Sequence, residues 1–138
     1  MIIDEFFNYE LGDLEYRSLR FELVKLETEY YQKNCVINYT EYEVPYTRII
    51  EHKYFEDDKS DVTYITREYP DEYTLGKERY YPINNERNNN LYEKYAGLAA
   101  RQKNVIFGGR LANYKYYDMD DTVRAALDDA RKELGITK

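Results

Sequence analysis

Arg48 and Asn38 are the residues whose types and setting best suit the binding of a phosphorylated ligand. Arg48 follows the segment Val-Pro-Tyr-Thr at the start of a predicted strand, and a guanidinium can hold two phosphate oxygens at once. Asn38 lies on a strand face, and its amide can bind a sugar or a phosphate. A cross-strand ion pair for Arg48 and a satisfied strand amide for Asn38 remain the structural alternatives.

Two adjacent tyrosines form a third candidate. Tyr80 and Tyr81 precede Pro82, and a proline holds the residue before it in an extended conformation. Their hydroxyls can donate hydrogen bonds to phosphate oxygens, or their rings can simply pack. The sequence leaves both interpretations open.

A fourth candidate is the start of the last predicted helix, at Tyr116, Tyr117, Asp118, Met119 and Asp120. Unpaired N–H groups at a helix N-terminus attract electron-rich atoms, including the pyrimidine edge of a flavin. Aspartates in a first helical turn also offset the helix dipole without any ligand. The spacing alone does not separate these two roles.

Other kinds of catalytic chemistry have little support in the sequence. His52 is the only histidine and lies in a strand pattern, which favours a structural or surface role and argues against a histidine-dependent triad. Cys35 is the only cysteine, so an internal disulfide is excluded. Neither a Gly-rich phosphate-binding loop nor a Cys/His metal cluster is present. We therefore expect no metal site.

Composition restricts the partners. The chain has 138 residues, enough for one modest core, and a formal net charge of −7, which argues against nucleic acid or an anionic membrane as its main partner. No uncharged run is long enough to span a bilayer, and no secretory signal peptide is recognisable. These properties favour a cytoplasmic protein. The 18 tyrosines, with no tryptophan, are typical of an aromatic-rich sheet.

The hydrophobic pattern predicts an α+β fold. Alternation from Leu19 predicts one strand, residues 35–43 a second, and residues 47–55 and 61–69 a hairpin around the polar turn 56–60. Strands that follow one another through short turns favour an antiparallel sheet. A long irregular loop is expected over 70–90, and such length favours a functional loop.

The C-terminal part of the sequence is predicted to be mainly helical. A helix begins among Asn88 to Asn90, and an apolar strand follows at 104–109. In the last helix Asp118 is the predicted N-cap, with Asp121 in a capping-box position. The strand and the last helix form a βα unit. Because a lone βα unit cannot bury both faces, we expect partner strands from elsewhere.

Five segments resemble UDP-galactopyranose mutase, a flavoenzyme family: residues 4–22, 38–56, 66–73, 80–88 and 108–120. VPYTRIIEHK (44–53) and the Gly-Gly-Arg-Leu-Ala segment with its following Tyr-Tyr-Asp-Met-Asp are the most specific. The resemblance implies the C-terminal third to two-fifths of such an enzyme, without the N-terminal FAD-binding half. The βα unit would then complete a Rossmann-like FAD-binding domain. The implied division is about 13–85 for sheet and substrate loop, and about 86–138 for helix, strand and flavin-capping helix.

The resemblance also implies roles for individual residues. By this resemblance, the residues that contact UDP-galactose are Asn38, Arg48, Tyr81 and Tyr116. Contacts to FAD fall on Arg110, Tyr117, Asp118, Met119, Asp120, Asp121 and Thr122. Glu68 matches a family position near the active site, and no role is assigned to it. No protein side chain is expected to be the catalytic nucleophile.

The family reaction isomerises UDP-galactopyranose to UDP-galactofuranose, a precursor of cell-wall or surface polysaccharides. In the family reaction, attack of reduced-flavin N5 on the anomeric carbon displaces UDP. The sugar ring then opens and recloses as a five-membered ring, and UDP returns to the anomeric carbon. The isolated chain is expected to be inactive because it lacks the N-terminal half. The alternatives are a non-catalytic UDP-sugar-binding module and a structural fragment that needs a partner chain. Exposed sheet edges and apolar faces make a homo-oligomer possible.

Overall fold

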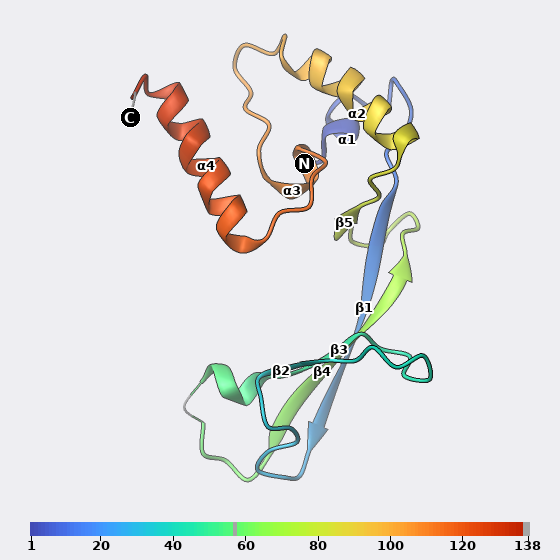
Figure 1. Cartoon of the computed structure of the whole chain (residues 1–138), viewed down its shortest axis with the longest axis vertical. Coiled ribbons are helices and arrows are strands. Elements are labelled where there is room, and N and C mark those ends of the chain that lie inside the picture. Colours follow the sequence, from blue (N-terminus) through green and yellow to red (C-terminus); the bar gives the residue numbers. More distant parts are fainter. Residues whose placement is uncertain (57, 137–138) are drawn as a thin grey trace. The chain divides into compact units, whose positions relative to one another are not determined.

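The computed structural model describes residues 1–56 and 58–136 and has a mixed α/β architecture with an antiparallel sheet (Figure 1). Its contacts divide the chain into two units. The sheet unit comprises residues 18–74, and the helical unit comprises residues 1–17 and those from 75 onward. Among the described helices, none combines the length and the apolar character that a membrane crossing requires.

The sheet unit contains four strands in the order β2-β3-β4-β1. Their bounds are Tyr16–Leu26 for β1, Val36–Asn38 for β2, Arg48–Glu51 for β3 and Thr63–Glu72 for β4. β3 pairs antiparallel with both β2 and β4. A 3₁₀ turn, His52–Phe55, follows β3. The alternating pattern from Leu19 and the pairing of residues 47–55 with 61–69 are therefore confirmed in outline, and Asp57 of the predicted turn lies outside the described residues.

One face of this sheet carries a small core. Ile49 and Ile65 are fully buried, and Glu51 is buried beside them. The Glu51 carboxylate accepts hydrogen bonds from the backbone N–H groups of Tyr31 and Gln32, at 2.9 Å each, and from the Thr63 hydroxyl at 2.7 Å. A buried carboxylate is tolerated when its lone pairs are satisfied in this way. The core therefore ties the segment before β2 to β3 and β4.

The helical unit is built around the short strand β5, Tyr81–Pro82, which pairs antiparallel with the first residues of β1. Its helices are α1 (Ile3–Phe6), α2 (Glu86–Ala99), α3 (Gly109–Ala112) and α4 (Met119–Glu133). At α2, Asn85 is the N-cap, and its side chain accepts a hydrogen bond from the backbone N–H of Asn88. Residues 70–90, predicted as one irregular loop, thus include the end of β4, all of β5 and the start of α2.

The predicted strand at 104–109 is wrong. No strand forms there, and Gly109 instead begins the short helix α3. The described chain provides no neighbouring strand with which this apolar run could pair, and an unpaired strand leaves its backbone groups unsatisfied. Phe107 instead packs edge-on against Phe6, with ring centroids 4.9 Å apart, and stacks on Phe7. The expected βα unit is therefore absent from the described residues.

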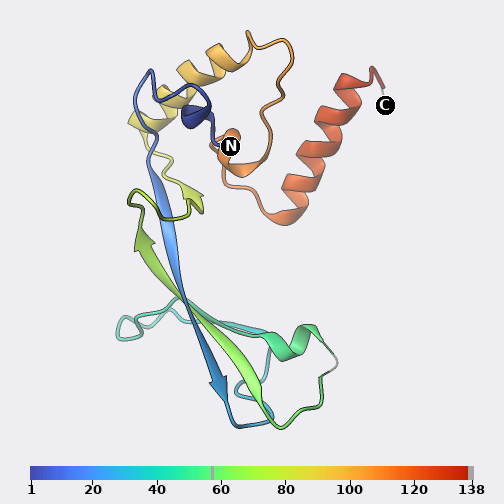
Figure 2. The same cartoon turned by 180° about the vertical axis from the view of Figure 1, so that it is seen from behind.

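Helix α4 packs on the rest of its unit along only one side. None of its residues is buried, and it contacts α3 near Gly108 and Asp129. Both cartoon views show it apart from α1 and α2 (Figures 1 and 2). Successive residues of a helix are rotated by about 100°, which places Val123, Leu127 and Leu134 on one side of α4, nearly opposite Asp129. All three are at least half exposed, and we call them the apolar stripe of α4. An amphipathic helix with its apolar stripe in water is incompletely packed.

Candidate functional site

Arg48 lies in a row of polar residues across three strands of the sheet unit. It is directly opposite Asn38 on β2 and directly opposite Glu68 on β4. Directly opposed residues of antiparallel strands present their side chains on one face. Asn38 and Arg48, which the sequence could only place on separate strands, therefore belong to one polar row. Glu68 is the third member of this row.

Arg48 forms an ion pair and still has exposed surface. Its Nε atom lies 3.5 Å from Oε1 of Glu68, and 40% of its side chain is exposed, against 9% for Glu68. Nε is buried and has no hydrogen-bond partner, and the terminal nitrogens also form no hydrogen bond within the part of the chain that the structure describes. The cross-strand ion pair considered from the sequence is thus present, and it leaves the outer edge of the guanidinium available.

In the helical unit, Tyr81 and Tyr116 stack on each other, with ring centroids 5.7 Å apart and planes inclined by 19°. The Arg110 guanidinium lies over both rings, 5.1 Å from the centroid of Tyr81 and 4.7 Å from that of Tyr116. Cation–π contacts of this kind hold a guanidinium and two rings as one group. The two tyrosines that the resemblance assigned to UDP-galactose therefore lie together, joined by an arginine assigned to FAD.

Backbone contacts fix this group in place. Arg110 donates from Nε to the carbonyl oxygen of Tyr117 at 3.0 Å, and its Nη2 contacts the same oxygen. The Tyr114 hydroxyl donates to the carbonyl of Glu15 at 2.6 Å and accepts from the N–H of Ile83 at 3.2 Å. Burial raises the pKa of Tyr114 to about 12. Tyr114 thus anchors the segment that carries Tyr116 to the start of β1 and the end of β5.

The start of α4 lies where it was predicted, but its capping hydrogen bonds differ from the prediction. Asp118 is the N-cap residue, but its side chain makes no capping hydrogen bond, so the predicted capping box does not form. Thr122 donates from both its N–H and its hydroxyl to the carbonyl of Asp118, at 3.0 Å each. The N–H groups of the first turn therefore lack a side-chain partner among the described residues, and they can donate hydrogen bonds to an electron-rich ligand atom.

These donors fit one part of a flavin. The free N–H groups of α4 and the cationic Arg110 nearby suit the carbonyl-bearing edge of an isoalloxazine ring. The sequence contains no Gly-rich loop for the pyrophosphate of FAD. The arrangement thus suits a ring-contacting segment, with the remaining FAD contacts left to other residues.

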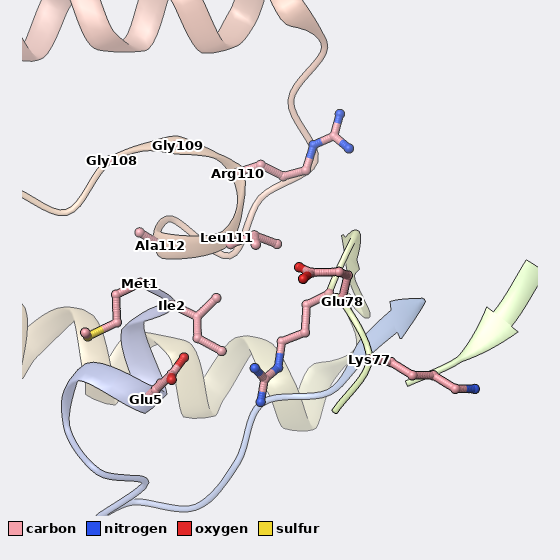
Figure 3. Close-up of a pocket in the computed structure, with 11 residues that line it drawn as sticks. Met1, Ile2, Glu5, Lys77, Glu78, Gly108, Gly109, Arg110, Leu111 and Ala112 are labelled. Atoms are coloured by element: carbon pink, nitrogen blue, oxygen red, sulfur yellow. The ribbon is translucent and has the colours of Figure 1, made fainter. Parts of the chain in front are cut away.

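A cavity of about 460 Å³ lies in the same unit (Figure 3). It is lined by residues from the N-terminus, from the segment before β5 and from α3: Met1, Ile2, Glu5, Lys77, Glu78, Arg79, Gly108, Gly109, Arg110, Leu111 and Ala112. Figure 3 shows that the Arg110 guanidinium extends away from Met1 and Ile2. Of the residues predicted to bind ligands, only Arg110 lines this cavity.

Two features of the site escaped prediction from the sequence. Glu68 was noted without a role, although it is 7% exposed and contacts Arg48. The stacking of Arg110 on Tyr81 and Tyr116 had no sequence signal, because the residues come from separate segments. His52 has its expected surface position, with Nε2 at 2.7 Å from the Thr66 hydroxyl.

Comparisons with known proteins point to one family. The family model of UDP-galactopyranose mutase matches residues 1–116, a range that includes Asn38, Arg48, Tyr81 and Tyr116 and ends before α4. A probable UDP-galactopyranose mutase of Klebsiella pneumoniae is 43% identical over 135 residues, covering 96% of this chain and 34% of the relative.

Two other relatives show the same coverage pattern. A dTDP-fucopyranose mutase of Escherichia coli is 39% identical over 132 residues, covering 94% of this chain and 34% of the relative. A UDP-galactopyranose mutase of Mycoplasma genitalium is 35% identical, covering 96% of this chain and 34% of the relative. The chain thus spans about a third of the length of the curated relatives it matches. The chain belongs to the UDP-galactopyranose mutase family.

Proposed function

We propose that this chain is the C-terminal part of a mutase that isomerises UDP-galactopyranose to UDP-galactofuranose with reduced FAD. One observation carries the proposal: all four candidate substrate residues lie inside the family match. The exposed part of the Arg48 side chain agrees with it. The product would serve cell-wall or surface polysaccharides, and the reaction would take place in the cytoplasm. The chain alone would be inactive.

Each substrate residue has a role that its chemistry suits. Arg48 binds the diphosphate and offsets the charge that builds up as UDP leaves the anomeric carbon. The hydroxyls of Tyr81 and Tyr116 donate to phosphate oxygens, and Arg110 keeps their rings stacked. Asn38 donates from its amide to the sugar or the phosphate. No side-chain nucleophile is required.

For the cofactor, we assign Arg110 and the segment from Tyr117 to Thr122 to the flavin ring. The free N–H groups at the start of α4 support this assignment. When bound, reduced FAD supplies the nucleophile that displaces UDP. The protein side chains hold the ring, orient the sugar and keep the departing UDP close for its return.

The remaining part of the enzyme would be longer than this chain. The relatives are about three times as long as this chain, and the apolar stripe of α4 has no partner among the described residues. We assign that stripe to contact with the FAD-binding part, where α4 would complete a Rossmann-like domain. A homo-oligomer remains a second way to cover exposed apolar surface.

A second substrate is favoured by one relative. The dTDP-fucopyranose mutase of Escherichia coli is 39% identical to this chain. A deoxythymidine diphosphate sugar offers the same diphosphate to Arg48 and a similar pyranose to Asn38. dTDP-fucopyranose is therefore the alternative substrate.

Product analysis tests the proposal. The chain alone, given reduced FAD and UDP-galactopyranose, is expected to yield no UDP-galactofuranose by chromatography. Activity is expected when the remaining two-thirds of the Klebsiella pneumoniae relative are co-expressed with it. dTDP-fucopyranose in a parallel reaction distinguishes the two substrates. Activity of the chain alone, or no activity toward either sugar after assembly, would contradict the proposal.

A further inference from the structure

Glu68 is a buried carboxylate with few partners. It lies on β4, directly opposite Arg48 of β3, and is 7% exposed. Its Oε1 atom is 3.5 Å from Arg48 Nε and 3.4 Å from the Thr47 hydroxyl, which also lies 3.2 Å from the Glu68 carbonyl. Burying a carboxylate is costly unless a cation or donors compensate it. Arg48 is the only cation paired with Glu68 within the described residues.

This contact occupies only one side of the guanidinium. Because Nε of Arg48 faces Glu68 and is itself buried, the exposed part of the side chain lies elsewhere. A guanidinium carries five N–H donors in a rigid plane, of which Nε contributes one. The Glu68 contact therefore fixes the direction of the plane while the terminal nitrogens remain available.

A second arginine–glutamate pair in the same sheet unit provides a contrast. Arg67 uses a terminal nitrogen, Nη1, to contact Oε2 of Glu22 at 3.2 Å. The same carboxylate oxygen accepts from the Tyr69 hydroxyl at 2.7 Å, and both contacts lower the pKa of Glu22. In that pair a terminal nitrogen of the arginine already binds a carboxylate of the protein. In the Arg48 pair neither terminal nitrogen has a hydrogen-bond partner among the described residues, as a ligand-binding arginine requires.

We propose that Glu68 is a positioning residue that holds Arg48 with its terminal nitrogens directed outward before an anionic diphosphate arrives. This inference rests on the proposed role of Arg48 in binding UDP. A long side chain that is fixed in advance loses less conformational freedom on binding. Because Nε of Arg48 is buried without a hydrogen-bond partner among the described residues, the charge of the Glu68 carboxylate, rather than a hydrogen bond, sets the direction of Arg48.

Two substitutions separate these roles. Glu68→Gln keeps the volume and one acceptor oxygen, whereas Glu68→Ala removes the acceptor. We expect Glu68→Ala and Glu68→Gln each to weaken UDP binding about tenfold, because both remove the charge that holds Arg48. Glu22→Ala is the matched control, because it removes a carboxylate from the other arginine pair. Glu68→Met, which fills the space without an acceptor, replaces Glu68→Ala if that variant fails to fold.

The experiment has two readouts on the 138-residue chain. The first is the ¹⁵Nε–¹Hε signal of Arg48, assigned by its loss in Arg48→Lys, and recorded without ligand. The second is a UDP titration by calorimetry. Glu68→Ala and Glu68→Gln are both expected to shift or broaden the Arg48 signal and weaken UDP binding, while Glu22→Ala leaves both readouts close to wild type. Thermal melting verifies that each variant folds.

The outcomes separate this inference from the proposed function. An Arg48 signal that is unchanged in Glu68→Ala overturns the inference, as does unchanged UDP binding by a folded Glu68→Ala variant. Wild-type behaviour of Glu68→Gln in both readouts also overturns it, because a neutral side chain would then hold Arg48 equally well. If the wild-type chain does not bind UDP but the Arg48 signal responds as expected, Glu68 positions Arg48 and the role of Arg48 in UDP binding fails.

Discussion

Replacing Arg48 with alanine is expected to lower kcat/KM for UDP-galactopyranose by roughly 30-fold to several thousand-fold in the assembled mutase. The reason is that truncating one partner of a desolvated charge pair costs about 2–5 kcal/mol. Arg48→Ala also leaves the buried Glu68 without its cation, so the lost attraction to the diphosphate is joined by repulsion from a carboxylate. Steady-state kinetics of product formation measure the effect.

Arg67→Ala is the matched control for this prediction. Arg67 pairs with Glu22, lies beside Tyr46 and belongs to the same sheet unit, but it has no assigned ligand. We expect its kcat/KM to stay within a few-fold of the wild type. Kinetics of Arg48→Ala close to the wild type, or an equal loss in Arg67→Ala, would show that Arg48 has no special role in substrate binding.

The second large effect is expected at α4. Leu127→Asp combined with Val123→Asp should weaken association with the remaining two-thirds of a mutase by at least ~100-fold. Burying a valine and a leucine contributes about 1.5–3 kcal/mol each, and the new carboxylates would have to be desolvated. Both residues are at least half exposed here, so the change need not disturb the chain itself. Calorimetry with the separately purified partner segment measures the affinity.

Lys132→Asp serves as the control, because it also adds an acidic side chain to α4 but lies away from the apolar stripe. We expect it to associate nearly as tightly as the wild type, and sedimentation of the chain alone reports any self-association. Unchanged association of the double variant would show that the stripe is not the contact. If the chain alone forms dimers through Val123 and Leu127, the apolar stripe contacts a second copy of the chain instead.

Local sequence patterns predicted those strands and helices whose position depends on neighbouring residues in the sequence. Alternation over Leu19, Phe21 and Leu23 predicts the strand β1, but Phe21 and Leu23 are exposed, so the pattern located the strand without identifying its buried face. Asp118 marks the start of α4 in the same way. The apolar run at 104–109 predicted a strand that does not form, because strand formation depends on a neighbour that a local pattern cannot supply. Phe107 packs in an aromatic cluster instead.

Prediction of the candidate site from local sequence patterns has the same limit. Arg48 and Asn38 were recognised from their residue types, but their alignment with Glu68 depends on strand register, which requires the pairing of three distant segments. The stacking of Arg110 on Tyr81 and Tyr116 likewise depends on where α3 places its side chains. Residue chemistry was therefore predictable, whereas the partners that orient each residue were not.

The most direct test of the substrate assignment is a UDP titration of the isotope-labelled chain assembled with an unlabelled partner segment, followed by NMR. The account predicts that signals from Asn38, Arg48, Tyr81 and Tyr116 shift together and saturate with one dissociation constant. Binding of UDP that leaves Arg48 and Tyr116 unperturbed would contradict it.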